Sequence, residues 1–150
     1  MLKYKNLQEV FDRIFMVVHG LGMNEKNLNA KLPSYEHLPF GCFIGLCLPK
    51  DLAEDLQKEG IKHWKYAIES VIECRHLSEV FQEVYEIFQN IHTSQLQDLQ
   101  SIHHGIAPYD WDSALRKFAV LNGLAVPQMY TESWNTNVTA LKKEFIVTPF

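Results

Sequence analysis

The chain has 150 residues, of which 47% are hydrophobic and 21% charged, so it is long enough and apolar enough to bury a core as one domain over residues 1–150. The formal net charge of −4 argues against a nucleic-acid partner, because binding to phosphate backbones depends on clustered lysine and arginine side chains. No apolar run approaches the roughly 20 residues that span a bilayer, and residues 1–5 do not resemble a signal peptide. We therefore expect a cytoplasmic protein that has no contact with a membrane.

The first predicted element is an amphipathic helix that follows Asn6. Apolar residues recur at three- and four-residue spacing over residues 7–18 and form one stripe. Asn6 followed by Glu9 is typical of a capping box, and Gly20 can adopt the left-handed conformation that stops a helix. Residues 20–39 lose this periodicity and contain several Gly, Asn and Pro residues, which predicts a long loop.

The pattern in the middle of the chain predicts one buried apolar segment and three amphipathic helices. The run over residues 40–48 fits either a buried strand or a short buried helical turn, because periodicity cannot separate the two at this length. Residues 51–56 predict a short acidic helix, and residues 64–72 predict another apolar stripe. A strong stripe covers residues 80–91, with Ser78 as the N-cap of its helix.

Two further helices are predicted by their caps. Ser94 followed by Gln97 resembles a capping box, and it precedes a short helix with an apolar face. Asp110 is the expected N-cap of the next helix, and Gly123 is its expected end.

The tail from about residue 127 has a weaker pattern. It fits one more helix over residues 137–144 and a terminal strand over residues 145–147. Together with the earlier elements, this predicts a mainly α fold: a single-domain bundle of about five to six helices, with room for a minor, short strand pair.

Seven histidines are the first candidates for chemistry, because neutral imidazole binds metals and acts as a general base near pH 7. No two have the four-residue spacing that places two metal ligands on one helix face. Convergence of His92, His103, His104 and Asp110 at the 105–110 turn would nevertheless suit a hydrolytic metal site. The alternative is that His103 bonds a backbone carbonyl and His104 faces water, since adjacent helical side chains point in different directions. We predict no metal and no cofactor.

The cysteines and glycines match no catalytic or nucleotide-binding pattern. Cys42 and Cys47 lack the two-residue separation of redox pairs and zinc sites, and Cys74 has no nearby second cysteine. We expect all three to be buried thiols in a reducing compartment. Gly41 and Gly45 are not followed by the Lys-Ser/Thr pair of a phosphate-binding loop.

Tyr130 and Trp134 stand out because they lie in a polar tail with few apolar neighbours. Tyrosine and tryptophan dominate the binding energy of many protein interfaces, so these two are the predicted partner-binding residues. The alternative is that both rings pack back onto the helices.

Two segments resemble a group of small bacterial and phage proteins that have no assigned activity. Residues 41–49 match the Cys-x-Ile/Val-Gly-x-x-Ile/Leu-Pro pattern of that group, and residues 96–103 contain its Leu-Gln-x-Ile/Leu-His string. Trp111 and the Gly-Leu pair at 123–124 also have counterparts there. The group carries His-Asp where this chain has His-His at 103–104, so the carboxylate of that pair is missing here. The resemblance implies a bacterial or phage origin and supplies no mechanism.

These patterns favour a non-enzymatic binding or regulatory accessory protein that acts through protein–protein contacts. The sequence offers no catalytic constellation, whereas the acidic balance and the 20–39 loop suit a protein partner. The alternative is a small hydrolase with a His-based, metal-assisted site formed by His103 and Asp110. A structural homo-oligomer is a third hypothesis, and the sequence leaves the oligomeric state open.

Overall fold

The computed structural model describes residues 3–24, 43–58 and 79–145, and these residues form a helical protein. The described α-helices are α1 (Leu7–Gly20), α3 (Lys50–Lys58), α5 (Glu79–Phe88), α6 (Thr93–Gly105), α7 (Trp111–Leu121) and α8 (Glu132–Phe145). Two short 3-10 helices, η2 (Gly45–Cys47) and η3 (Pro108–Asp110), connect them. No strand occurs in the described ranges. The predicted mainly α fold with five to six helices is confirmed.

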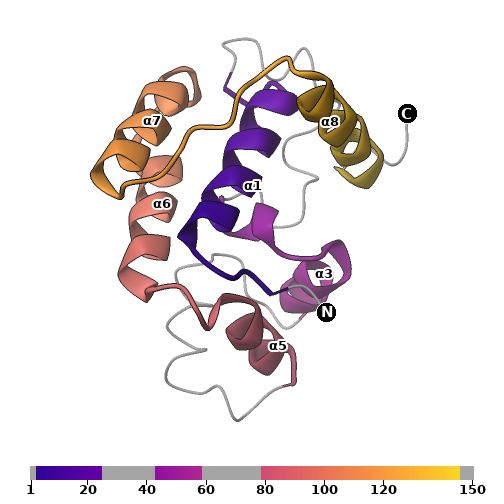
Figure 1. Ribbon diagram of the computed structural model, residues 1–150. Helices are drawn as coiled ribbons and strands as arrows, with labels where there is room; N and C mark the ends of the chain where they lie inside the picture. Colours follow the sequence, from indigo (N-terminus) through magenta and orange to yellow (C-terminus); the bar gives the residue numbers. More distant parts are fainter. Residues whose placement is uncertain (1–2, 25–42, 59–78, 146–150) are drawn as a thin grey trace.

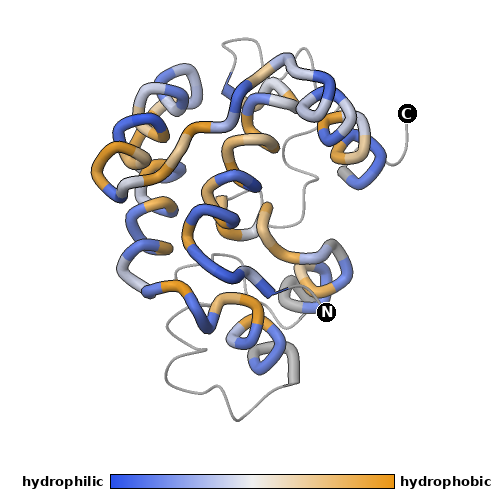
Figure 2. Tube along the Cα trace, viewed as in Figure 1, coloured by the Kyte–Doolittle hydropathy of each residue, from blue (hydrophilic) through white to orange (hydrophobic). Residues whose placement is uncertain are grey.

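Helix α1 lies at the centre of the described structure (Figure 1). It packs against η2, α7 and α8, while α6 packs on α7 and α3 packs on α5. Residues 122–131, which we call the strap, lead from α7 across α1 to α8 (Figure 1). Apolar residues recur between polar ones along the helices (Figure 2), as expected where each helix buries one part of its surface.

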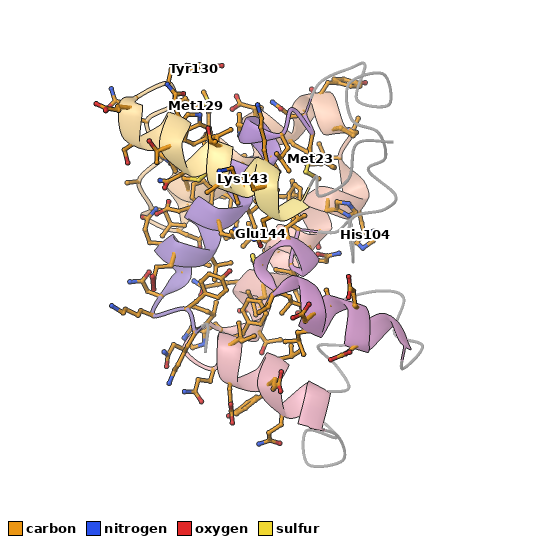
Figure 3. The ribbon with its side chains drawn as sticks, turned by 90° about the vertical axis from the view of Figure 1, so that its right-hand side faces the viewer. Met23, His104, Met129, Tyr130, Lys143 and Glu144 are labelled. Atoms are coloured by element: carbon orange, nitrogen blue, oxygen red, sulfur yellow. The ribbon has the colours of Figure 1, made fainter. Side chains whose placement is uncertain are left out.

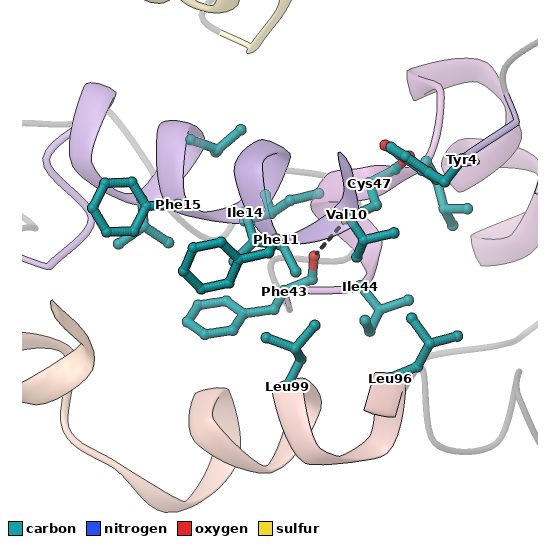
Figure 4. Close-up of a cluster of buried hydrophobic side chains, with 14 of the residues drawn as sticks. Tyr4, Val10, Phe11, Ile14, Phe15, Phe43, Ile44, Cys47, Leu96 and Leu99 are labelled. Carbon is teal, nitrogen blue, oxygen red and sulfur yellow. Dashed lines mark hydrogen bonds between the residues drawn. The ribbon is translucent and has the colours of Figure 1, made fainter. Parts of the chain in front are cut away.

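The core is built around a broad apolar arc on α1. Its buried side chains are Val10, Phe11, Ile14, Phe15, Val17 and Val18. Because successive helical residues are about 100° apart, these side chains cover nearly half of the helix circumference. The ring of Phe11 stacks on Phe118 of α7 with 6.1 Å between centroids, and Phe15 meets the edge of Trp134 of α8 at 6.2 Å. Phe43, before η2, lies below Phe11 (Figure 4).

The segment before α1 ties η2 and α5 to the core. The hydroxyl of Tyr4 donates a 2.7 Å hydrogen bond to the carbonyl of Cys47, and its ring stacks on Phe88. The N–H of Tyr4 also donates to the carbonyl of Ile87 at 3.0 Å. Cys47 is buried as predicted, and its thiol donates to the carbonyl of Phe43 at 3.6 Å (Figure 4). Cys42 and Cys74 lie outside the described residues.

The predicted N-cap of α1 is confirmed. The side-chain oxygen of Asn6 accepts a 3.1 Å hydrogen bond from the N–H of Glu9. The Glu9 carboxylate accepts a 2.7 Å hydrogen bond from the N–H of Lys5, one residue earlier than in a standard capping box. The start of α1 is therefore fixed by local sequence.

The end of α1 lies at Gly20 as predicted, but the left-handed residue is Gly22, whose φ is +69°. The N–H of Met23 donates to the carbonyl of Val18 at 2.8 Å, and the N–H of Gly22 donates to the carbonyl of His19 at 3.3 Å. This is the Schellman pattern, in which the left-handed glycine follows the C-cap residue. The prediction that Gly20 itself takes the left-handed conformation is wrong.

Gly20 instead lets α8 approach α1 closely. A Cβ atom built on Gly20 would lie 2.8 Å from Cγ2 of Val138, which is closer than real Cβ contacts occur. Helix α8 is also held by Arg13, which binds the carboxylate of Glu144 through two nitrogens at 2.6 and 3.3 Å. The third guanidinium contact of Arg13, from Nε to the carbonyl of Leu46 at 3.0 Å, links α8 to η2 through α1.

The caps of α6 and α7 were predicted in part. Helix α6 begins at Thr93 after the N-cap residue His92, so the prediction that Ser94 caps it is wrong. Asp110 occupies the N-cap position of α7 as predicted, although its side chain forms no capping hydrogen bond with the described N–H groups of α7. Gly123 ends α7 with a φ of +65°, which confirms that prediction.

The tail forms a longer helix than predicted. Helix α8 begins at Glu132 instead of residue 137, because the hydroxyl of Thr131 accepts a 3.1 Å hydrogen bond from the N–H of Trp134. Phe145 is still helical, so the predicted strand does not start there, and residues 146–147 lie outside the described residues.

The apolar run and the middle stripes have mixed outcomes. Residues 43–48 form a turn and η2, which is the helical alternative for the 40–48 run. Helix α3 contains the predicted acidic helix, and α5 contains most of the 80–91 stripe. The stripe over 64–72, the cap Ser78 and residues 25–39 of the predicted loop lie outside the described residues. Among the described helices, none is long and apolar enough to cross a membrane.

We expect the Gly20→Ala substitution to destabilise the protein. Alanine favours a helix over glycine, but here its methyl group would overpack the contact with Val138, and we expect a net loss of about 1 kcal/mol in the free energy of unfolding. The matched control is Gly105→Ala, at the last residue of α6, where a Cβ atom meets nothing within 4 Å. That variant should gain about 0.5 kcal/mol. Urea denaturation measures both values, and equal effects of the two substitutions would contradict the close crossing.

Candidate functional site

The predicted histidine ligands do not converge. His92 precedes the first residue of α6 and His103 lies in its last turn, so their backbones are about 16 Å apart at 1.5 Å per residue. Two ligands of one ion lie within a few ångströms of each other. No group of three metal-binding side chains occurs within the described residues. The arrangement of His92, His103 and His104 therefore does not form a metal site.

His103 is surrounded by aromatic rings. Its ring centroid lies 5.4 Å from that of Phe43 and 5.4 Å from that of Trp111, and 5.0 Å from that of His104. Asp110, the predicted carboxylate partner, is exposed at the start of α7. The position of His103 is thus defined by ring packing in the wall of the core.

His104 is exposed and interacts with the one buried polar residue of the described core, Gln100. The Nε2 atoms of the two side chains lie 2.9 Å apart. The amide oxygen of Gln100 accepts a 3.3 Å hydrogen bond from the N–H of Ile44. Figure 3 labels His104. Gln100 therefore connects the backbone before η2 to the end of α6.

A histidine–carboxylate pair does form, but between residues that the sequence analysis did not single out. Nε2 of His19, in the last turn of α1, lies 2.7 Å from Oδ1 of Asp112, in the first turn of α7. Nε of Arg116 donates to both carboxylate oxygens of Asp112 at 3.0 and 3.1 Å. We call His19, Asp112, Arg116 and the Phe15 backbone and ring the His19 cluster.

Both ring nitrogens of His19 are engaged by oxygen atoms. Nδ1 lies 2.9 Å from the carbonyl oxygen of Phe15, and the imidazole stacks on the Phe15 ring with 3.9 Å between centroids. The guanidinium of Arg116 lies 5.5 Å from the centroid of the same ring. Only 7% of the His19 side chain is exposed. His19 thus joins α1 to α7, with both of its ring nitrogens facing oxygen atoms of the protein.

The carboxyl group of Asp112 is held in its charged form. Burial alone would raise the pKa of Asp112, but the hydrogen bonds from His19 and Arg116, together with the charges of these groups, outweigh it and lower the pKa below its ordinary value. The Asp112 side chain remains 40% exposed, so solvent screens part of this interaction.

The two predicted partner-binding residues have different surroundings. Trp134 is only 6% exposed and packs edge-on against Phe15, as the alternative prediction had it. Tyr130 is 82% exposed and projects from the edge of the molecule next to Met129 (Figure 3). Its backbone φ is +64°, and Tyr130 is the non-glycine residue with positive φ in the described chain. A partner could therefore reach Tyr130 but not Trp134 in this structure.

Three other large apolar side chains are exposed in the described structure: Tyr109, Val120 and Leu121. The sequence analysis missed them. A usable signal was present, because Val120 and Leu121 follow Ala119 in an apolar run that is longer than one buried stripe of a helix requires.

Comparisons of the chain with protein-family models, curated proteins and solved structures found no match. The resemblance to small bacterial and phage proteins therefore stays a prediction. Of the first segment that carries it, residues 43–49 are described, and they form the turn at η2 that packs against α1; the second segment, residues 96–103, lies in α6.

We expect the Asp112→Asn substitution to change the acid sensitivity of the protein. A carboxyl group whose pKa is lowered by folding stabilises the fold above its unfolded pKa, near 3.9, and this contribution is lost as the pH falls through the folded value. At pH 6 the variant should lose about 1 kcal/mol of unfolding free energy, a small value because the carboxylate is partly exposed.

The difference between wild type and Asp112→Asn should shrink as the pH is lowered from 5 to 2.5 in urea denaturation series. Asp98→Asn, which alters an exposed carboxylate of α6, is the control and should track the wild type. A stability difference between wild type and Asp112→Asn that is constant over this range would argue against a charge-assisted contact.

Proposed function

We propose that this protein is a non-enzymatic binding protein that acts through contact with a protein partner, and that Tyr130 is a principal contact residue. The observation that carries the proposal is the combination of an 82% exposed tyrosine side chain with a left-handed backbone at the same residue. The bacterial or phage origin and the cytoplasmic location belong to this proposal: the origin derives from the sequence resemblance, and the location from the three cysteines, which the sequence predicts to be free thiols in a reducing compartment.

The left-handed backbone of Tyr130 costs the isolated chain conformational free energy. A left-handed conformation costs a residue with a Cβ atom about 1 kcal/mol or more, and glycine or asparagine would adopt it more readily. The exposed ring recovers little of this cost through packing within the chain. Tyrosine is enriched at the centres of protein interfaces, where its ring buries a large area and its hydroxyl forms a hydrogen bond. An intermolecular role accounts for a tyrosine at this position.

The strap holds Tyr130 in a fixed place. The side-chain amide of Gln8 donates to the carbonyl of Ala125 at 2.8 Å and accepts from its N–H at 2.9 Å, so the strap is bonded to α1 as a neighbouring strand would be. Leu124, Val126 and Met129 are partly buried against the core. A binding residue that is fixed before association loses less conformational entropy when it binds.

The other exposed apolar side chains do not carry the proposal by themselves. Val120 and Leu121 belong to the regular helix α7, and single exposed apolar residues are common on protein surfaces. The net charge of −4 favours a partner with a basic surface, because opposite charge speeds association.

We expect Tyr130→Asn to separate stability from binding. Asparagine tolerates the left-handed conformation, so the free energy of unfolding should stay equal or rise by up to about 1 kcal/mol. Partner binding should fall at least tenfold, the usual loss for a central interface tyrosine. Tyr130→Phe is the matched control, because it retains the ring and the backbone conformation and should retain most of the binding.

A photo-crosslinking amino acid at position 130 identifies the partner directly. In lysate of the source cell, it should give a discrete crosslinked species that untagged wild-type protein competes away and that untagged Tyr130→Asn does not. The same amino acid at Thr136, which is exposed on α8, is the positional control. No competed species from position 130, in lysates from several growth conditions, would contradict the proposal.

A further inference from the structure

We propose that the His19 cluster is a proton-dependent latch between α1 and α7, complete only when His19 carries a proton on each ring nitrogen. The latch joins residues that are 93 positions apart in the chain, and the described contacts between α1 and α7 include it. It is independent of the proposed role of Tyr130.

The argument rests on the hydrogen-bonding capacity of the two oxygens that face the imidazole. A backbone carbonyl can only accept, and an ionised carboxylate can only accept. The carbonyl of Phe15 lies 2.9 Å from Nδ1, and Oδ1 of Asp112 lies 2.7 Å from Nε2. Both distances are those of hydrogen bonds, so both nitrogens must donate. Neutral imidazole has only one N–H, whereas imidazolium has two.

The charged groups of the His19 cluster both come from α7. Asp112 contacts the imidazole directly, and Arg116, the other charged group of the cluster from α7, is itself bonded to both oxygens of that carboxylate. On α8, Trp134 and Val138, which are uncharged, pack on this end of α1. His19 also lies in the last turn of α1, where the partial negative charge of the helix end favours a cation.

Among the described residues of α1, the charged side chains that precede His19 lie further along the helix. Arg13 is bonded to Glu144, and it precedes His19 by about 9 Å along the helix axis. Asp12 accepts a hydrogen bond from Gln8, about 10 Å before His19. Within the described ranges, the polar groups around the imidazole are thus the carbonyl of Phe15 and the pair formed by Asp112 and Arg116.

The direction of the pH effect follows from this geometry. When His19 loses a proton, one nitrogen presents a lone pair to an oxygen less than 3 Å away, and one of the two hydrogen bonds is lost. The stabilisation is therefore present at the acidic side of the range, about pH 5 to 8, in which histidine side chains change charge, and it is lost as the pH rises. Asp112 remains ionised throughout that range because its pKa is lowered.

The test compares unfolding of the full chain at pH 5.5 and pH 8.5, followed by the fluorescence of its tryptophans in urea. The wild-type unfolding equilibrium constant should increase about fivefold more between these pH values than that of His19→Gln, which cannot change charge. His92→Gln is the matched control, because His92 is exposed and makes no side-chain capping bond, and it should behave as the wild type. Equal pH dependence of wild type and His19→Gln overturns the latch.

A second measurement needs no variant and so holds even if His19→Gln fails to fold. In wild-type protein with ¹⁵N-labelled histidine at pH 5.5, His19 should give two ring N–H signals that exchange slowly with water, because both are hydrogen-bonded and the ring is buried. Raising the pH to 8.5 should remove one of them. A nitrogen of His19 that carries no proton at pH 5.5 overturns the proposal.

Discussion

The structure depends on a central helix whose apolar arc is too broad to be covered from one side. The buried residues of α1 span nearly half of its circumference, so η2, α7 and α8 must all pack against it. Burial of this arc drives the chain together, but apolar contacts alone tolerate several rotations of one helix on another. Polar residues at the margins of the arc remove that freedom. Gln8 bonds the strap, Arg13 bonds both η2 and α8, and His19 bonds α7.

These marginal bonds explain why α7 and α8 occupy defined places although each buries only a narrow apolar stripe. Gln8, Arg13 and His19 bind different elements, and each of their bonds is directional. The close crossing at Gly20 adds a steric condition, since α8 can approach α1 only where no side chain intervenes. The strap, which joins α7 to α8, is consequently fixed at both ends and at Ala125, and it presents Tyr130 to solvent.

Elements with local signals were predictable from the sequence. The stripe of α1, its Asn6 cap and the Gly123 end of α7 depend on contacts within a few residues, and all were predicted. Predictions failed where distant contacts decide, and where the local pattern is weak. Gly20 was taken as a left-handed residue because it follows an apolar stripe, yet its role is set by Val138, 118 positions later. The start of α8 was placed too late because its cap, Thr131, precedes a polar stretch without helical periodicity.

The candidate sites show the same division. The exposure of Tyr130 fits its polar surroundings in the sequence, whereas Trp134 is buried by an α1 residue that no local pattern connects to it. The sequence has two signals near the His19–Asp112 contact: His19 borders the apolar stripe, and Asp112 and Arg116 have the four-residue spacing of a helical ion pair. Neither signal connects the two helices, so the contact itself was not predictable.

Native-state hydrogen exchange in increasing urea tests the central role of α1 most directly. If all other elements are organised on this helix, the amides of residues 11–18 should exchange only when the whole protein unfolds, with the free energy of global unfolding. Exchange of these amides at a lower free energy, while those of α6 and α7 stay protected, would contradict the account, because α1 could then open without the rest of the structure.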